Sequence, residues 1–307
     1  IVVLGPTAGG KSELAVRLAE SLGGQVISAD SMQVYRHMDV GTAKPSKEQQ
    51  KRAIHHGVDI IEPVERFTVA DWLTLAEKAI ADIQAQGQTP IVVGGTNLYI
   101  KALLEGMFEG PGIDEALREE LAALPLEALH PRLAAVDPQS AARIHPNDRK
   151  KLIRAIEVFE LTGKPISAHQ TQWEEPVAGQ EARTEYRHNP ILIGLEWPAE
   201  AINPRINLRV KAMFYPDKVE PQLLADLNIT RSLAEEVQEL ESQNRWADQA
   251  RQALGYKQVL EALRGQISMD EAYEKTKILT RRFAKTQRTW LRRYRSVKWI
   301  AASGRDA

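Results

Sequence analysis

Residues 5–12, with the sequence GPTAGGKS, restrict the fold of this chain more than any other stretch. Gly5, four intervening residues, Gly10, Lys11 and Ser12 have the spacing of a phosphate-binding loop, or P-loop. Glycines let consecutive backbone N–H groups turn inward around an anion, because they lack a Cβ. The lysine adds a positive charge, and the serine hydroxyl can bind the magnesium ion that accompanies a polyphosphate. We therefore expect a phosphate ligand at this loop, in preference to a chance glycine-rich turn.

The segments around the loop predict an α/β fold. A β-branched run precedes the loop and a segment with helical periodicity follows it, an order that directs a helix N-terminus at a phosphate. Further strands are expected at 23–31 and 90–96, with a helix at 69–87 between them. This alternation indicates a doubly wound parallel sheet with helices on both of its faces.

The middle of the chain has a different character. Residues 110–185 have helical periodicity and no convincing strand, whereas residues 189–198 return to a strand pattern. We therefore predict a P-loop core made of residues 1–109 and 186–307, with an inserted all-helical domain at 110–185.

The ends of two predicted strands carry candidate catalytic residues, because ligands bind beyond the carboxyl ends of parallel strands. Asp30 could hold magnesium, or it could act as general base on an acceptor bound beside the phosphates. A helix N-cap is the structural alternative for this residue. The next strand ends in Gly94, Gly95 and Thr96, where many P-loop hydrolases have acidic residues. A neutral hydroxyl there favours a transferase over an enzyme that hydrolyses ATP.

The charge of the chain is unevenly distributed. The net charge is −1, yet ten basic residues and no acidic residue lie from Lys275 to Lys298. Removing these ten charges leaves −11 on the rest of the chain. A basic segment on an otherwise acidic protein is typical of a localised binding site for a polyanion.

Helical spacing predicts one cationic face in this segment, since positions three or four residues apart share a face. A purely cationic face favours binding to a phosphate backbone over a merely solvated helix. The basic residues with this spacing are Lys277, Arg281, Lys285, Arg288, Arg292 and Arg295. The apolar residues expected to be buried on another side are Ile278, Phe283, Trp290, Leu291 and Tyr294. A second basic cluster on the inserted domain could bind the same polyanion and consists of Arg149, Lys150, Lys151 and Arg154.

Composition excludes several kinds of site. The chain has no cysteine, which rules out disulfides, thiol nucleophiles and cysteine-bound zinc and makes a cytoplasmic location the default. No apolar run reaches the length needed to cross a bilayer. His55 and His56 have no further ligand at metal-binding spacing, so we interpret them as packing or local hydrogen-bonding residues.

Six stretches together resemble the tRNA dimethylallyltransferase (tRNA isopentenyltransferase) family of the bacterial type. They follow one another from residue 5 to about residue 295 in the order expected for that family. A single P-loop is common to many families, but this combination is specific. The stretches are GPTAGGKS, ISADSMQVYRHMDVGTAKP, VVGGTNLYIKALLEG, ARIHPNDRKKLIRAIEVF, ALGYKQ and TRRFAKTQRTWLRR.

The resemblance implies transfer of a dimethylallyl group from its diphosphate to the exocyclic amino nitrogen of adenosine 37, next to the tRNA anticodon. The loop would bind the diphosphate as leaving group, with Mg²⁺ bound through Ser12. A P-loop also binds ATP in many proteins, but we expect diphosphate to be the ligand here. Asp30 would accept a proton from the attacking amine, and Thr96 would orient the reacting groups. The implied diphosphate-binding residues are Gly5, Thr7, Ala8, Gly9, Gly10, Lys11, Ser12 and Arg209.

The resemblance also implies the tRNA anticodon stem-loop as partner of a monomeric, cytoplasmic enzyme that does not bind membranes. Residues 30–33 would contact an adenine flipped out of its stack, and the basic segments would contact the stem-loop. The implied tRNA-binding residues are Asp30, Ser31, Met32, Gln33, Arg149, Lys150, Lys151, Arg154, Gln252, Gly255, Tyr256, Lys257, Arg281, Lys285, Arg288 and Arg292.

The chain departs from the family pattern at two places. Thr286 stands where the family usually has arginine, so one contact with the tRNA backbone is in question. Residues 214–232 intervene where the family usually has a short glycine-containing turn, close in sequence to Arg209.

Three alternatives remain open from the residues. A P-loop kinase of a nucleoside or small metabolite would share the sheet and the loop, but an arginine-rich lid over a second phosphate is not evident. An isopentenyltransferase acting on free adenine nucleotide would not require the basic C-terminal face. An RNA-binding protein whose loop only senses nucleotide would not require Asp30 beside the phosphates.

Overall fold

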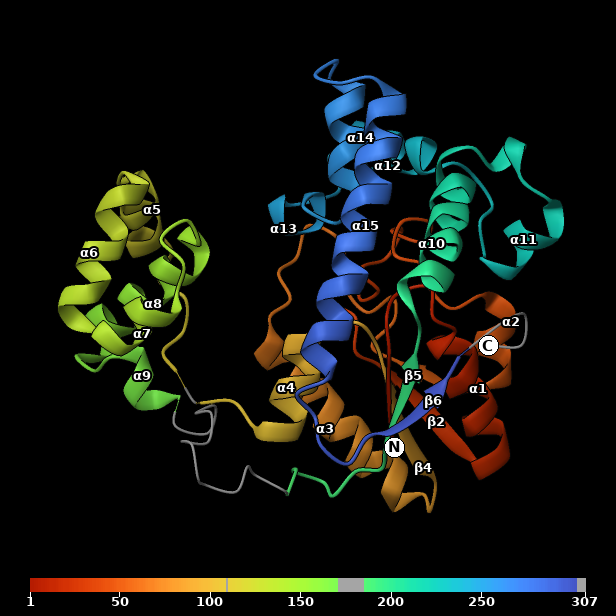
Figure 1. The fold of residues 1–307 in the computed structure, drawn as a ribbon, viewed down its shortest axis with the longest axis horizontal. Coiled ribbons are helices and arrows are strands. Elements are labelled where there is room, and N and C mark those ends of the chain that lie inside the picture. Colours follow the sequence, from red (N-terminus) through yellow and green to blue (C-terminus); the bar gives the residue numbers. More distant parts are fainter. Residues whose placement is uncertain (109, 171–184, 303–307) are drawn as a thin grey trace. The chain divides into compact units, whose positions relative to one another are not determined.

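The computed structural model describes residues 1–108, 110–170 and 185–302. The chain divides into two compact units (Figure 1). The first comprises Ile1–Leu104 together with Arg187–Ala307, and the second comprises Glu105–Tyr186. The first unit contains the sheet and the P-loop.

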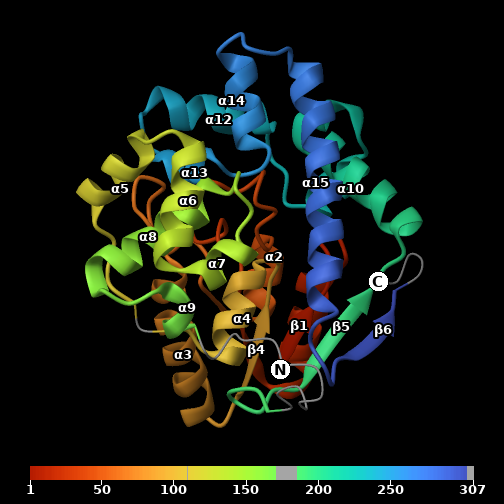
Figure 2. The same ribbon diagram turned by 60° about the vertical axis from the view of Figure 1, so that its left-hand side comes forward.

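A parallel sheet with the strand order β3-β2-β4-β1-β5-β6 forms the centre of the first unit. In Figure 2, β4, β1, β5 and β6 follow one another from left to right. The predicted parallel α/β architecture is therefore confirmed. The strands are β1 (Val2–Leu4), β2 (Gly24–Ser28), β3 (His55–His56), β4 (Thr89–Val93), β5 (Leu192–Glu196) and β6 (Lys298–Ala301).

Two of these strands were not predicted. The two-residue β3 pairs with β2, while His55 Nδ1 lies 2.8 Å from the Ala53 carbonyl and His56 Nε2 lies 2.7 Å from Gln25 Oε1. Local hydrogen bonding by these histidines agrees with their interpretation from the sequence. The edge strand β6 pairs with β5 and is exposed along its length, so no apolar alternation marks it in the sequence.

Helices cover both faces of the sheet. Helix α1 (Lys11–Leu22) starts after Gly10 and packs on the face that carries Val3 and Val26. Helix α3 (Val69–Ala85) lies on the other face (Figure 1) and starts with a capping box at Thr68. Its buried Trp72 donates a 2.8 Å hydrogen bond to the Ser28 carbonyl. The end of β2 is thereby fixed two residues before Asp30.

The remaining helices of the first unit lie mostly after β5. Helices α10 and α14 both pack on α15, the long helix that runs beside α10 in Figure 1. These elements are α2 (Lys47–Arg52), α4 (Asn97–Glu105), α10 (Ala199–Phe214), η2 (Pro216–Lys218), α11 (Pro221–Asp226), α12 (Leu233–Ser242), α13 (Asp248–Arg251), α14 (Tyr256–Leu263) and α15 (Met269–Leu291). No helix in the described ranges is long and apolar enough to cross a membrane.

Helix α15 differs from the prediction in its length and in its buried face. The helix ends at Leu291, so Arg292 is its C-cap and Arg295 lies beyond the predicted continuous face. Phe283 and Ile278, which were expected to be buried, are 43% and 40% exposed. Leu291 and Tyr294 are buried, as expected, and the other residues that α15 buries are Ala272, Thr276, Ala284 and Gln287.

The segment 214–232, which departs from the family pattern, forms η2 and α11 in succession. Tyr215 Oη donates a 2.5 Å hydrogen bond to Asp270, and Ile229 is buried. The segment is therefore tied to the start of α15 at one end and packed into the unit at the other.

The second unit is helical throughout its described residues and has its own core. Leu121, Leu133, Leu152 and Ile156 are among the residues of that core. Glu157 is fully buried within the unit, where it accepts hydrogen bonds from two arginines. The helices are α5 (Glu115–Ala123), α6 (Leu126–Val136), α7 (Pro138–Arg143), α8 (Arg149–Thr162) and α9 (Ile166–His169).

Candidate active site at the carboxyl edge of the sheet

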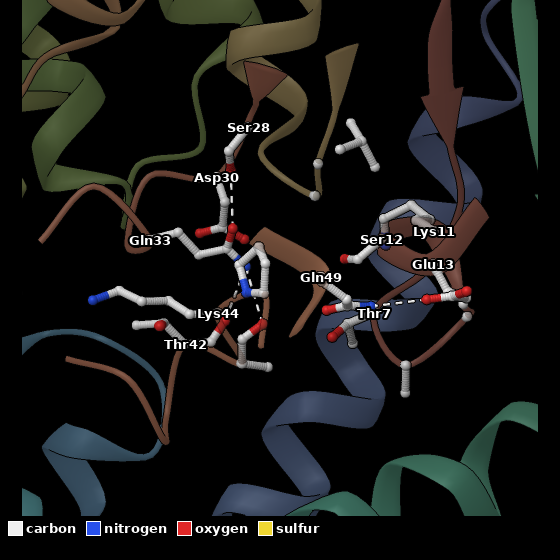
Figure 3. Close-up of a pocket in the computed structure, with 18 of the residues that line it drawn as sticks. Thr7, Lys11, Ser12, Glu13, Ser28, Asp30, Gln33, Thr42, Lys44 and Gln49 are labelled. Carbon is white, nitrogen blue, oxygen red and sulfur yellow. Dashed lines mark hydrogen bonds between the residues drawn. The ribbon is translucent and has the colours of Figure 1, made fainter. Parts of the chain in front are cut away.

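The P-loop connects β1 to α1 and lines a cavity of about 210 Å³. Ala8 and Gly10 have φ angles of 60° and 84°, the left-handed conformation that lets the backbone turn tightly around an anion. The first N–H groups of α1 have no partners within the helix and lie at its positive end. In Figure 3, Lys11 and Ser12 lie across the view from Asp30 and Gln33. The residues from Thr7 to Ser12 thus line the cavity, whereas Gly5 does not line it and lies against Leu195.

Side chains from distant elements donate hydrogen bonds to carbonyls of the P-loop. Arg205 Nε on α10 donates a 3.0 Å hydrogen bond to the Ala8 carbonyl, and Trp197 Nε1 after β5 donates one of 3.0 Å to the Gly9 carbonyl. The guanidinium of Arg205 also stacks over the Trp197 ring at 4.8 Å. These bonds satisfy the carbonyls of Ala8 and Gly9 and hold the backbone of the loop in place.

Two cationic head groups are buried at this cavity. The pKa of Lys11 is lowered to about 8, because burial disfavours its charged form and Arg209 repels it, while Asp30 acts in the opposite direction. Burial and the charge of Arg205 lower the pKa of Arg209 to about 10. The buried Nε of Arg209 has no hydrogen-bond partner in the described part of the chain. A bound anion would stabilise both charges and supply that partner, which supports a phosphate ligand.

Asp30 lies where the phosphate cavity meets a second cavity of about 260 Å³. Its Oδ1 accepts a 2.9 Å hydrogen bond from the Met32 amide. Burial raises the pKa of the Asp30 carboxyl. The backbone N–H of Met32, the charge of Lys11 and the backbone N–H of Gln33 oppose this shift. The second cavity has a largely apolar lining that includes Met32, Val210, Met213, Leu254 and Phe283.

Thr96 connects the end of β4 to the Asp30 segment. Its Oγ1 accepts a 2.9 Å hydrogen bond from the Ser31 amide and donates one of 3.3 Å to Ser31 Oγ. The Thr96 amide donates to the Ala29 carbonyl at 3.0 Å. A Cβ on Gly94 would lie 2.1 Å from the Ala29 carbonyl oxygen, so only glycine permits this close approach. Sequence reasoning placed Thr96 near Asp30, and the structure brings the two segments together.

Several predicted RNA contacts have other partners in the structure. The prediction for the Tyr256 side chain is wrong, because it is fully buried and its hydroxyl bonds to Glu236. The side-chain amide of Gln33 donates hydrogen bonds to the carbonyls of Thr42 and Ala43 and accepts one from the Ser28 hydroxyl. Neighbouring Gln252 and Gly255 line the second cavity.

The two basic clusters also divide into engaged and exposed side chains. Arg149 donates to the Leu124 carbonyl at 2.8 Å, and Arg154 donates to the Pro111 carbonyl at 2.9 Å and to Glu157. Arg288 is half-buried and donates a 3.0 Å bond to the Trp197 carbonyl. These three guanidinium groups therefore have structural partners, unlike the prediction of a freely presented cationic surface. The exposed members of the two clusters are Lys150, Lys151, Lys285, Arg292 and Arg295, with Arg281 half-exposed, and Lys257 is an exposed lysine outside them.

Sequence reasoning missed four residues of the site. Trp197 and Arg205 support the P-loop, and Gln287 on α15 accepts a 2.8 Å bond from the Thr7 amide. Phe283 lines both cavities, although its place in the sequence indicated a core residue. Only the tertiary structure brings these side chains to the loop, so no local sequence signal identifies them.

Two family models and many curated relatives match this chain. A model of the IPP transferase family matches residues 33–294, and one for isopentenyl transferase matches residues 1–55. The tRNA dimethylallyltransferase of Geobacter sulfurreducens is 44% identical, over 98% of this chain and 91% of the relative. The tRNA dimethylallyltransferase of Thermoanaerobacter pseudethanolicus is 43% identical, over 98% of this chain and 90% of the relative.

Solved structures give the same picture. The tRNA isopentenylpyrophosphate transferase of Bacillus halodurans has a TM-score of 0.67 and 36% identity, covering 98% of this chain and 88% of its own. A eukaryotic dimethylallyltransferase acting on tRNA has a TM-score of 0.74 and 26% identity, and the match covers 94% of this chain and 69% of the other.

The lowered pKa of Lys11 predicts a pH-dependent phosphate affinity. In the protein without a bound anion the pKa of Lys11 is about 8, and an anion bound beside the lysine raises this pKa. Binding therefore takes up a proton when the pH exceeds 8. We expect the affinity for inorganic diphosphate to fall by up to ~10-fold per pH unit above that value. Calorimetric titrations of the protein and of the Lys11→Met variant, between pH 7 and 9.5, separate this effect from titration of the diphosphate itself. Identical pH dependence in the two proteins would contradict the prediction.

Proposed function

The chain belongs to the IPP transferase family, and we propose that it transfers the dimethylallyl group of dimethylallyl diphosphate to the exocyclic amino nitrogen of adenosine 37 in tRNA. The observation that carries this proposal is the meeting of a phosphate cavity and an apolar cavity at Asp30. A hydrolase needs only water beside its phosphate site. Two adjoining cavities provide room for a donor and an acceptor with a carboxylate between them.

The P-loop binds the diphosphate of the donor. Lys11 and Arg209, whose head groups are buried, supply positive charge without the reorganisation that water would need. Negative charge grows on the diphosphate as the allylic C–O bond breaks. Stabilisation of this charge accelerates the departure of the diphosphate. The bound anion also favours the charged forms of Lys11 and Arg209, so it opposes the lowering of their pKa values by burial.

The second cavity receives the acceptor base. An adenine must leave its stack before its amino group can react, and apolar side chains favour the flipped ring. The amino nitrogen forms a bond to the allylic carbon, diphosphate leaves with the electrons of the C–O bond, and the proton on nitrogen passes to the Asp30 carboxylate. The raised pKa of Asp30 makes it a better proton acceptor than an exposed aspartate.

A magnesium ion fits this site only if water and substrate phosphates supply most of its ligands. Within the described ranges, no group of three or more histidine, aspartate or glutamate side chains could hold a metal ion. Mg²⁺ commonly keeps several waters and binds through one or two protein groups together with substrate phosphates. The Ser12 hydroxyl, which lines the phosphate cavity, is the protein ligand we propose. The ion would add positive charge to the leaving diphosphate.

The exposed basic residues near the end of α15 are the surface we propose for the anticodon stem-loop. Lys285 and Arg292 are exposed there, and Arg281 is half-exposed. Sequence-independent contacts of this kind supply much of the affinity for a nucleic acid. Since tRNA is the acceptor, we also infer a cytoplasmic location and a monomeric enzyme.

Substitution of the proposed base tests the chemistry. Asp30→Asn removes the proton acceptor and keeps the shape, so we expect the transfer rate to fall by about 10²–10⁴-fold. The affinity for tRNA should remain nearly unchanged. The measurement is transfer of labelled dimethylallyl diphosphate to tRNA, with Asp82→Asn on the outer surface of α3 as the matched control. A large loss of tRNA affinity would make Asp30 a binding residue and reject the proposed step.

Salt dependence tests the RNA surface. Lys285→Ala and Arg292→Ala should each weaken tRNA binding and reduce the slope of log affinity against log salt by about 0.7–0.9. Lys47→Ala, which removes an exposed lysine from α2, should leave the slope unchanged. Filter binding at several salt concentrations measures the tRNA affinity and the salt slope of all three variants. An unchanged slope in the α15 variants would remove this helix from the RNA interface.

A further inference from the structure

Gln287 on α15 connects two loops of the site through one side-chain amide. Its Oε1 accepts a hydrogen bond from the Thr7 amide at 2.8 Å, and its Nε2 donates one to the Gly95 carbonyl at 2.8 Å. The side chain is only 1% exposed, although it lies at the edge of the phosphate cavity. We call this pair of hydrogen bonds the Gln287 bridge. The chemistry proposed above does not use it.

The bridge requires the chemical properties of an amide. One end must accept from a backbone N–H while the other donates to a backbone carbonyl, and a neutral glutamine does both. A carboxylate could only accept, and an ammonium group could only donate. The partner position is also restricted, because a Cβ on Gly95 would lie 2.4 Å from Gln287 Nε2. Gly95 and Gln287 therefore fit each other closely.

The two bridged loops carry the two halves of the proposed reaction. Thr7 belongs to the P-loop, which binds the leaving diphosphate. Gly95 lies between Gly94, which packs against the Ala29 backbone, and Thr96, which bonds to Ser31. The Gly95 loop is thus attached to the segment that contains Asp30. The bridge fixes the separation between the loop of the leaving group and the loop of the proton acceptor.

We propose that Gln287 is a positioning residue that sets the alignment of donor and acceptor for the transfer step, an inference that rests on the proposed function. Displacement at the allylic carbon requires the attacking nitrogen, the carbon and the leaving oxygen to be aligned. A misplacement of about 1 Å can cost ~100-fold in rate. Each loop retains its own contacts without the bridge, so each substrate still binds. The loss therefore falls on kcat and not on the binding of either substrate.

Gln287→Met tests this inference, because it preserves the length of the side chain and removes both hydrogen bonds. We expect kcat to fall by about 10–100-fold, with the dissociation constants for inorganic diphosphate and for tRNA, each measured alone, nearly unchanged. Gln25→Met is the matched control. Gln25 is also buried, and its amide bonds to Gln86 and Gln88 at the opposite edge of the sheet. An equal loss of kcat in both variants would reduce the role of Gln287 to general stability and overturn the inference.

Gln287→Glu gives a signature that a merely structural role does not produce. The introduced carboxylate still accepts from the Thr7 amide, but its second oxygen faces the Gly95 carbonyl. When protonated, the carboxyl donates to that carbonyl and restores the bridge. The ratio of kcat in the variant to kcat in the unsubstituted protein should therefore rise as the pH falls. A ratio that is independent of pH would overturn the inference.

Failure of this inference differs from failure of the proposed function. If the unsubstituted protein transfers no dimethylallyl group to tRNA, the proposed function is wrong, and the inference falls with it. If it does transfer the group, and Gln287→Met retains full kcat or changes only the binding of diphosphate, the proposed function stands and the inference is rejected.

Discussion

The hydrogen bonds from side chains to the P-loop carbonyls are the constraint on which the rest of the site depends. Lys11 bonds to the Pro6 carbonyl, Arg205 to that of Ala8 and Trp197 to that of Gly9. These partners come from α1, α10 and the end of β5, which lie far apart in the sequence. Because these three carbonyls are bonded to side chains, the loop keeps a defined backbone conformation, with Lys11 and Arg209 placed at the cavity to bind one anion. Substitutions of Arg205 or Trp197 would therefore alter phosphate binding through the loop backbone, without removing a group that binds the ligand.

The arrangement beside the loop decides what happens to that anion. The glycines after β4 allow the backbone of this loop to pack on the Asp30 segment, and Asp30 consequently lies between the two cavities. A carboxylate placed between a phosphate site and an apolar cavity fits a reaction in which a proton leaves an acceptor as diphosphate leaves a donor. The family to which the chain belongs performs a reaction of this class on tRNA.

The parts of this site with local signals could be predicted from the sequence, and those formed by tertiary contacts could not. Glycine spacing identified the P-loop, and strand patterns located β2, β4 and β5 together with Asp30 and Thr96. The exposed edge strand β6 has no apolar alternation, and its lysine at position 298 was counted with the cationic segment. On α15, helical periodicity alone does not reveal which face meets the P-loop, so Gln287 was missed and Phe283 was wrongly expected to be buried. Tyr256 lies in a family motif, but its side chain is a core residue that bonds to Glu236.

The most direct test of the account is the identity of the molecule that receives the prenyl group. The protein would be incubated with magnesium, labelled dimethylallyl diphosphate and an equimolar mixture of tRNA and AMP, while ATP hydrolysis is followed in parallel. The account predicts label in tRNA alone, on one adenosine next to the anticodon. Label in AMP would contradict the tRNA surface proposed on α15. No label together with rapid ATP turnover would contradict the assignment of the P-loop to a leaving diphosphate.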